Sequence, residues 1–423
     1  MKPDRVLATY LIETPHALEH VAAVMAGEQS SGTFVSVPGE TQALKERFGA
    51  QVLSVKPLDA VAAPTLPGSK APRSAGGQTQ YRRAEVVVSF PLHNFGPSLP
   101  NLFTTVAGNL YELQELSGVR LTDVELPPAF AEKYPGPAFG IEGTRKLAGV
   151  QGRPLIGTII KPSIGLTPEE LRPVVRALAS AGLDFIKDDE LNADPPYAPL
   201  ADRVTAAMAE IERVADKTGK KTMYAFNITG DVDELRRGHD LVKKLGGTCV
   251  MVCVNSVGLA GVAHLRRHCE LPIHGHRANI GAMSRCPLLG IGFTAFQKLY
   301  RLAGVDHLHV GGLDSKFYQT NAEVAQSIKD CLTPLLGGYL VMPAISSAQW
   351  AGSAVDTYAA TQTIDVIHLA GGGILAHPGG TVAGVRSMQQ GWEAALAGKG
   401  LADYAAGRPE LQAAIEKFGG RNG

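Results

Sequence analysis

Short apolar runs alternate with stretches of helical spacing through the last two thirds of the chain. Eight runs have the length and composition of buried strands, and they are residues 155–160, 183–187, 222–226, 249–254, 271–276, 306–310, 339–345 and 365–373. Between them, apolar residues recur at helical spacing, as in residues 167–182, 231–246 and 322–332. This alternation predicts a parallel α/β sheet, and eight units favour a closed (β/α)8 TIM barrel over an open doubly wound sheet.

The first 125 residues carry a different pattern. Residues 5–13 and 84–92 are rich in β-branched side chains and predict strands, whereas residues 16–26 have the spacing of a helix. The stretch from Pro64 to Gln80 is polar and rich in Gly and Pro, which is typical of a long loop or a disordered insert. We therefore predict a smaller α+β domain over residues 1–125. A linker over 126–140 then leads into a barrel domain over 126–423 that ends in helices.

Composition and charge narrow the function classes. The 423 residues include 40 Lys and Arg and 40 Asp and Glu, so the formal charge is zero. A balanced charge argues against nucleic-acid binding and against polybasic membrane attachment. The longest apolar runs are too short for a transmembrane helix. Five scattered cysteines, with charged residues in the first apolar stretch, favour reduced thiols in a cytoplasmic protein.

Polar and chargeable residues follow seven of the eight predicted barrel strands. In order along the chain they are Lys161, 187–190, Asn227, 274–277, His307 with His309, Ser346 with Ser347, and 371–373. The carboxyl ends of the strands of a βα barrel converge on one mouth, which is where active sites form. The pattern therefore predicts an active site at this mouth.

The most informative stretch is GLDFIKDDELNADPP, residues 182–196. A strand has a period of two, so Lys187 and Asp189 project to the same side, and Glu190 can turn into the mouth. Two carboxylates suit Mg²⁺, which prefers oxygen ligands, but an ammonium group beside them would repel the cation. Lys187 must either form a salt bridge with the acids or react with CO2 to give a carbamate, a third oxygen ligand. The residues alone leave both interpretations open, although burial at the mouth would favour the neutral amine that CO2 needs.

Several motifs in one order resemble the signatures of the RuBisCO large-subunit superfamily. They are GTIIKPSIGL, GLDFIKDDE, HGHRA, DHLHVGG and the AGGG and AHPGG segments. The resemblance spans nearly the whole chain, including the smaller N-terminal domain. It implies that Lys187 is the carbamylated lysine, that Asp189 and Glu190 are the other Mg²⁺ ligands, and that Lys161 moves a proton at the enolisable carbon.

The same resemblance implies roles around the substrate. His276 would contact substrate oxygens, Arg277 would hold a phosphate, and Lys316 would lie on a mobile loop. Further implied substrate and phosphate residues are His309, Ser346, Gly371 and Gly372. In the N-terminal domain, Glu28, Thr33 and Asn109 match residues that complete the partner subunit's site, which implies a homodimer with a shared active site.

Departures from the family pattern change the expected activity. Where the photosynthetic enzymes keep a second lysine, a further histidine, a Ser-Gly-Gly turn and a tryptophan, this chain has Ser163, Ile280, 346–348 as Ser-Ser-Ala, and Phe34. The lost lysine and histidine handle protons and incoming CO2, so carboxylation of a bisphosphate is disfavoured. The chain thus resembles a RuBisCO-like protein of the form IV branch, one that keeps the metal and enolate apparatus.

Enolate chemistry at a phosphate-binding mouth allows several activities. The first hypothesis is an Mg²⁺-dependent decarboxylase of a phosphorylated 3-oxo sugar acid, similar to the 3-oxo-isoapionate-4-phosphate decarboxylases. Alternatives are a transcarboxylase or hydrolase of the same β-keto acid, and an enolase or isomerase of methylthio-pentulose phosphates in sulfur salvage. A catalytically dead protein that binds sugar phosphates is the alternative from another class, and the intact Lys187, Asp189 and Glu190 set disfavours it.

Overall fold

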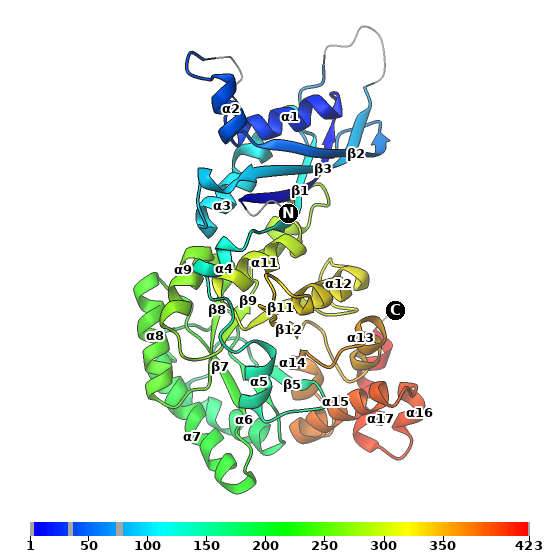
Figure 1. The fold of residues 1–423 in the computed structure, drawn as a ribbon. Helices are drawn as coiled ribbons and strands as arrows, with labels where there is room; N and C mark the ends of the chain where they lie inside the picture. The colour runs from blue at the N-terminus through cyan, green and yellow to red at the C-terminus, as the bar shows by residue number, and fades with distance from the viewer. Residues whose placement is uncertain (1–3, 33–36, 73–78, 422–423) are drawn as a thin grey trace. The chain divides into compact units, whose positions relative to one another are not determined.

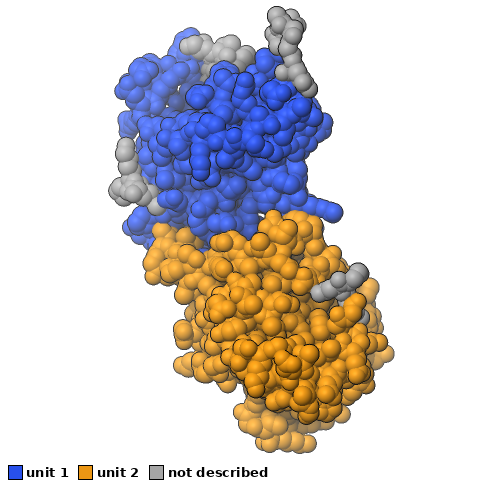
Figure 2. All heavy atoms as spheres, turned by 90° about the vertical axis from the view of Figure 1, so that its right-hand side faces the viewer, with its two compact units in different colours: residues 1–135, 279–302 blue, residues 136–278, 303–423 orange. Residues whose placement is uncertain are grey.

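The computed structural model describes residues 4–32, 37–72 and 79–421. Contacts within the chain divide it into two compact units, which Figure 2 colours separately. The first unit comprises residues 1–135 and 279–302, and the second comprises 136–278 and 303–423. The predicted loop from Pro64 to Gln80 lies between two strands of the first unit, and its residues 73–78 are outside the described part.

The second unit is a closed barrel of eight parallel strands (Figure 1), as the sequence predicts. The strands are β5 (Leu155–Ile159), β6 (Phe185–Lys187), β7 (Met223–Asn227), β8 (Cys249–Cys253), β9 (Ile273–His276), β11 (His307–Gly311), β12 (Met342–Ile345) and β13 (Ile367–Leu369). Each of them falls within or beside one of the eight predicted runs. Strand β13 pairs with β5 and closes the barrel, so the alternative prediction of an open doubly wound sheet is wrong.

Alternate residues of these strands fill the barrel. Buried members of one hydrophobic cluster recur at every second position, such as Phe185 in β6, Met223 and Ala225 in β7, and Ile367 and Leu369 in β13. Because a strand has a period of two, the residues that continue this inward row share the same face. The inward row of β6 therefore ends in a lysine, Lys187, directly after Phe185.

The helices of the second unit precede, connect or follow the barrel strands. They are α5 (Gly140–Ala148), α6 (Pro168–Ser180), α7 (Leu200–Thr218), α8 (Val232–Lys244), α9 (Val254–His268), α12 (Asn321–Leu332), α13 (Ser353–Thr361), α14 (Gly371–Leu375), α15 (Gly380–Leu396), α16 (Leu401–Ala405) and α17 (Pro409–Phe418). Capping boxes start three of them, with Thr167 and Glu170 at α6, Asp231 and Glu234 at α8, and Thr320 and Glu323 at α12. Among the described residues, every helix is too short or too polar to cross a bilayer.

The first unit is built on a five-stranded sheet in the order β10-β4-β1-β3-β2. Its strands are β1 (Arg5–Thr14), β2 (Gln51–Val61), β3 (Tyr81–Pro91), β4 (Gly118–Glu125) and β10 (Leu289–Ile291). Its helices are α1 (Leu18–Glu28), α2 (Gln42–Phe48), α3 (Leu99–Val106), α4 (Ala129–Lys133), α10 (Ile280–Ser284) and α11 (Phe293–Ala303). Strands β1 to β4 pair antiparallel, and β10 adds a parallel edge to β4.

Strand β10 shows that the first unit is not continuous in sequence. Residues 279–302 follow barrel strand β9, yet Leu289 pairs with Val119 of β4. The predicted division at residue 125 takes no account of this second segment. A three-residue strand carries too little pattern to be recognised alone, and β2 was missed because most of its residues are exposed on both faces.

We predict that Gly290 in β10 is required for this edge of the sheet. Its φ is +90°, and a Cβ there would overlap the carbonyl oxygen of Met283. Gly290→Ala should combine a left-handed backbone cost of about 1–2 kcal/mol with a clash of about 1–3 kcal/mol. The measurement is the free energy of unfolding in urea.

Gly96→Ala is the matched control, because Gly96 has φ +63° and an added Cβ would meet nothing within 4 Å. It should show the backbone cost alone, about 1–2 kcal/mol. Equal losses in the two variants would contradict the packing of β10 against the segment that contains Met283.

Candidate active site at the carboxyl end of the barrel strands

Lys187 is the centre of the candidate site. It ends β6 on the same face as the barrel core, and its residue is 0 % exposed. Its Nζ lies 3.6 Å from Oε2 of Glu190 and, among the described residues, has no hydrogen-bond partner. Burial lowers the pKa of Lys187, and the carboxylates of Glu190 and Asp189 only partly oppose this effect. The site therefore favours a neutral amine more than water does.

Lys161 approaches the same acids from the loop after β5. Its Nζ donates to Oδ2 of Asp189 at 2.8 Å and to Oγ of Ser163 at 2.7 Å. Asp189 is itself buried, and its other oxygen accepts from the backbone N–H of Leu191. The structure thus brings Lys161, Lys187, Asp189 and Glu190 together, and Ser163 occupies the position of the lost lysine as an acceptor.

Two predicted histidines lie beside this group. His276 of β9 has its Nε2 3.5 Å from Oε2 of Glu190, and its ring centroid lies 4.4 Å from that of His309 of β11. Ser346, after β12, has its Oγ 3.1 Å from Nδ1 of His309. Burial holds the pKa of both histidines well below the ordinary value, and neighbouring positive charges add to this. Both rings are therefore neutral at neutral pH.

A buried chain of hydrogen bonds sets the proton positions on two further histidines. Thr144 of α5 donates its hydroxyl to the carbonyl of Gly140, so its Oγ1 must accept from Nε2–H of His307 at 2.8 Å. Nδ1 of His307 then accepts from Nδ1–H of His274, 3.4 Å away. His274 consequently has an unprotonated Nε2, and that atom has no hydrogen-bond partner among the described residues. The spacing of His274 from His276 is the signal that links it to the site.

Asp188 faces away from the mouth, as its alternation with Asp189 predicts. It accepts from Nε of Arg203 at 3.2 Å, from the hydroxyl of Tyr224 at 2.7 Å and from the backbone N–H of Asn227 at 2.9 Å. Both Asp188 and Arg203 are almost fully buried. This network fixes the backbone between Lys187 and Asp189. Arg203 and Tyr224 were not identified from the sequence because their helix and strand give no signal of such a role.

Asn227 supports the acids from β7. Its Nδ2 donates to the backbone carbonyls of Asp189 and Glu190, at 3.2 Å in each case. Its Oδ1 accepts from the backbone N–H and the hydroxyl of Thr229. All of its side-chain atoms are therefore used for structure, which makes Asn227 a support for the two acids.

The predicted phosphate-binding residues lie on neighbouring strand ends. Arg277 is buried, which lowers its pKa to about 10, and it donates to Oε1 of Gln319 at the end of the loop after β11. Lys316 on that loop is exposed, with its Nζ 5.4 Å from the ring centroid of Phe317. Gly371 begins α14, and a Cβ there would lie 3.7 Å from Cε of Lys161.

Space remains open at the second predicted glycine. A Cβ on Gly372, the next residue of α14, would meet nothing within 4 Å. Two of the residues predicted for a partner subunit's site, Glu28 and Asn109, contact each other in the first unit. Nδ2 of Asn109 donates to Oε1 of Glu28 at 3.4 Å. Thr33 and Phe34 lie outside the described residues.

Another group on the helices has the spacing of metal ligands within the described part of the chain. His239, Asp240 and His268 place one ligand atom each within 4.8 Å of one another. The backbone N–H of Glu270 donates to Nε2 of His239, so the proton of that ring is on Nδ1, where it donates to Asp240 at 2.9 Å. The His239 ring therefore offers no free lone pair to a cation.

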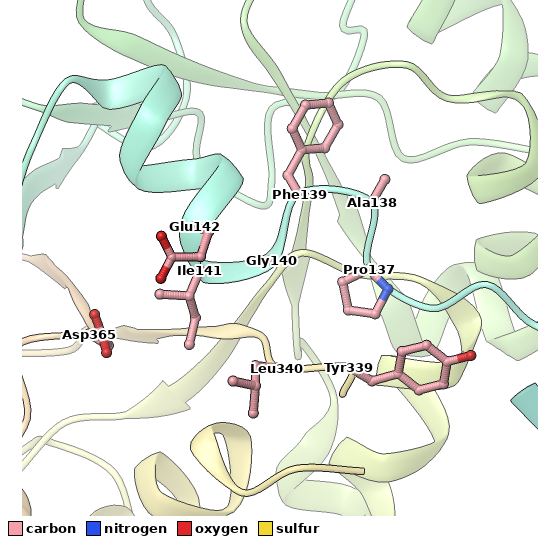
Figure 3. A pocket seen from close by; sticks show the side chains of 9 residues that line it. All are labelled: Pro137, Ala138, Phe139, Gly140, Ile141, Glu142, Tyr339, Leu340 and Asp365. Atoms are coloured by element: carbon pink, nitrogen blue, oxygen red, sulfur yellow. The ribbon is translucent and has the colours of Figure 1, made fainter. Parts of the chain in front are cut away.

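A cavity of about 280 Å³ lies at the other ends of the strands (Figure 3). It is lined by residues that begin α5 or precede β12 and β13, such as Phe139, Leu340 and Asp365. Asp365 is paired with Arg145 at 2.7 Å. None of the predicted site residues lines it, because those in the barrel lie at or after the carboxyl ends of their strands.

Comparison with known proteins gives matches along the whole chain. The family model of the ribulose bisphosphate carboxylase large chain, catalytic domain, matches residues 140–418, and that of its N-terminal domain matches residues 1–130. A crystal structure of a rubisco-like protein from Burkholderia fungorum is similar with a TM-score of 0.91 and 46% identity. It covers 98% of this chain and 100% of its own.

Two relatives are named for an enzymatic activity. A 3-oxo-isoapionate-4-phosphate transcarboxylase/hydrolase of Xanthobacter autotrophicus is 54% identical, covering 97% of this chain and 99% of its own length. A 3-oxo-isoapionate-4-phosphate decarboxylase of Rhizobium etli is 45% identical and covers 98% of both. Both relatives are therefore similar to this chain over essentially their full length.

We predict that His307 makes the fold sensitive to acid. Burial lowers its pKa to about 3, whereas an unfolded histidine titrates near ~6.5. As the pH falls below the pKa of the unfolded chain, His307 binds a proton in the unfolded chain but stays neutral in the folded one. The free energy of unfolding therefore decreases until the pH reaches about 3. At pH 4.5 the loss from this group is about 2–3 kcal/mol. Urea unfolding of the His307→Gln variant from pH 7 to 4.5 should show a correspondingly shallower loss.

His20→Gln is the control, because His20 is an exposed histidine. Its unfolding free energy should follow the pH dependence of the unmodified protein. An unchanged pH slope in His307→Gln would show that His307 takes up its proton in the fold and would contradict the assigned hydrogen-bond chain.

Proposed function

The chain belongs to the ribulose bisphosphate carboxylase large-chain family, and on that premise we propose that it is an enzyme acting on a phosphorylated 3-oxo sugar acid. In the proposed reaction the acid loses its carboxylate and leaves an enolate. The observation that carries this proposal is the buried Lys187 amine, which lies 3.6 Å from Glu190 and has no hydrogen-bond partner within the described part of the chain. A buried amine with no partner is costly unless a further group completes it.

Carbon dioxide and Mg²⁺ fit this group of residues. A neutral amine at Lys187 can form a bond to CO2 and release a proton, which gives a carbamate. The carbamate with Asp189 and Glu190 supplies the anionic oxygens that Mg²⁺ prefers. When bound, Mg²⁺ would supply the positive charge that stabilises an enolate.

The residues of this chain would handle the remaining steps. The bond between the carboxylate and its neighbouring carbon breaks, CO2 leaves, and the electron pair passes to the 3-oxo oxygen as the enolate. Lys161 returns a proton to the carbon, a role supported by its position at the acids, 2.8 Å from Asp189. His276, neutral and mostly buried, orients the substrate oxygens.

The phosphate would bind at the adjacent strand ends. Arg277 supplies the buried positive charge, and His309 and Ser346 supply polar contacts beside it. Gly371 and Gly372 leave room for an anion to approach the backbone N–H groups. Lys316, on the loop whose Gln319 is held by Arg277, would approach the bound substrate from outside.

A transcarboxylase or hydrolase outcome is the second candidate. It is favoured by the higher identity to the relative of that name, 54% against 45% for the decarboxylase. In a transcarboxylase the same bond would break first, and the released CO2 would add to another carbon of the enolate. In a hydrolase, water would add to the 3-oxo carbon, and the bond from that carbon to the one bearing the carboxylate would break. In both cases the carboxyl carbon would end in a product acid instead of leaving as CO2. The two candidates therefore differ in where one carbon atom finishes.

We also propose that the protein is a cytoplasmic homodimer. The support is the resemblance that places Glu28, Thr33 and Asn109 among residues completing a partner's site. The contact between Asn109 and Glu28 brings two of these three side chains together.

The function is tested with 3-oxo-isoapionate 4-phosphate labelled with ¹³C at its carboxylate, in the presence of Mg²⁺ and unlabelled bicarbonate. Decarboxylation should release labelled CO2, measured by membrane-inlet mass spectrometry. Lys187→Met should reduce turnover to background, because no carbamate can form. Lys329→Met, at an exposed position of α12, is the control and should keep full activity.

Each result decides between the candidates. Label retained in a product acid would assign the transcarboxylase or hydrolase outcome. No turnover of the labelled acid would refute the proposed substrate, and full activity of Lys187→Met would refute the carbamate.

Arg277 is predicted to recognise the phosphate. Arg277→Ala should weaken binding of the phosphorylated acid by about 1.5–3 kcal/mol, since a charge-assisted hydrogen bond is lost. Isothermal titration should show unchanged affinity for the unphosphorylated acid. Arg386→Ala, on the outer helix α15, is the control and should alter neither affinity. If Arg277→Ala lowered the affinity for both acids equally, Arg277 would not be the residue that recognises the phosphate.

A further inference from the structure

A chain of buried polar side chains runs from helix α15 to the barrel mouth. Nε1 of Trp392 lies 2.9 Å from Nδ1 of His368, and Nε2 of His368 lies 3.2 Å from Oε1 of Gln349. Nε2 of Gln349 then donates to the backbone carbonyls of Leu313, at 3.0 Å, and Ser347, at 2.8 Å. Trp392, His368 and Gln349 are each at most 2 % exposed.

The chemistry of the groups sets the direction of every bond in this chain. An indole N–H can only donate, so Nδ1 of His368 carries the lone pair. Burial lowers the pKa of His368 to about 3, so the ring is neutral and its one proton is on Nε2. That proton is donated to Oε1 of Gln349. The amide NH2 is thereby directed at the two carbonyls, which can only accept.

Gln349 is enclosed by three strand ends. It follows β12, and the loops after β11 and β13 approach it through glycines. A Cβ on Gly312 would overlap Nε2 of Gln349, and a Cβ on Gly373 would lie 2.5 Å from its backbone oxygen. The segments that carry Lys316, Ser346 and the Gly371–Gly372 pair therefore meet at this one residue.

The turn before Gln349 is strained. Ser347 and Ala348 have φ of 81° and 53°, values at which a side chain is disfavoured. Such a conformation persists only where surrounding contacts hold it. The bond from Gln349 to the carbonyl of Ser347 and that from the N–H of Ser346 to Gly311, at 2.9 Å, are those contacts.

We propose that Gln349 is a positioning residue for catalysis, oriented by His368 and Trp392, and that it fixes both Ser346 and the start of the Lys316 loop. The proposal rests on the proposed function, since Ser346 and Lys316 are assigned there to substrate binding. It adds residues with no substrate contact of their own. Trp392 acts on the mouth through His368 and Gln349.

The test compares Trp392→Phe and Gln349→Leu with the unmodified protein. Trp392→Phe keeps an aromatic ring and removes the donor, so it keeps the test decisive if Gln349→Leu fails to fold. Both variants should raise KM for the labelled acid by about 2- to 13-fold, the factor for one hydrogen bond, and with less change in kcat. Amide hydrogen exchange over residues 313–319, measured without substrate, should accelerate by a similar factor.

Gln390→Leu is the matched control, because Gln390 is on the same helix as Trp392 and the change breaks a partly buried side-chain hydrogen bond to Glu410 of α17. It should lower the melting temperature without changing KM or the exchange of residues 313–319. Unchanged exchange and KM in Trp392→Phe would overturn the proposal. If the unmodified protein does not turn over the acid, the proposed function fails, and faster exchange over 313–319 still supports the positioning role.

Discussion

The candidate site depends on an amine buried among side chains that cannot pair with it fully. Lys187 continues the inward row of β6, where the fold would otherwise place a hydrophobic residue. Water is excluded from it, Glu190 is 3.6 Å away, and Asp189 is already occupied by Lys161. The cost of burying the Lys187 amine falls if the amine loses its proton or if it gains a new partner. The surrounding carboxylates suit a partner that brings a cation with it.

The support for this arrangement comes from residues that never reach the mouth. Asp188, which alternates outward, is held by Arg203 and Tyr224. The side-chain NH2 of Asn227 donates to the backbone carbonyls of the two acids, and its Oδ1 accepts from Thr229. The histidines of β9 and β11 are neutral because they are buried, so they add no positive charge that would compete with a cation. Asp188 and Asn227 therefore fix the positions of Lys187, Asp189 and Glu190, whereas the buried histidines determine the charge beside them.

The periodic parts of the molecule could be predicted from the sequence, and the discontinuous parts could not. Eight apolar runs identified all the barrel strands, and a period of two assigned Lys187 and Asp188 to opposite faces. Strand β10 was missed because three residues carry too little pattern, and it pairs with a strand about 170 positions away in the chain. The Gln349 contacts were missed for a similar reason, since they depend on where three loops meet.

The ion pair between Lys161 and Asp189 also determines how the buried carboxylate is neutralised in the metal-free protein. The chain supplies its own counter-ion to a buried acid, so an apoprotein purified with a chelator would not hold that acid unpaired. Under the proposed function, Mg²⁺ binding would be an exchange of cations, in which the metal ion replaces the ammonium group of Lys161 beside Asp189. Lys161, which the metal ion would displace, is also the side chain proposed to transfer the proton. Metal binding would therefore release the Lys161 amine for catalysis in the same step.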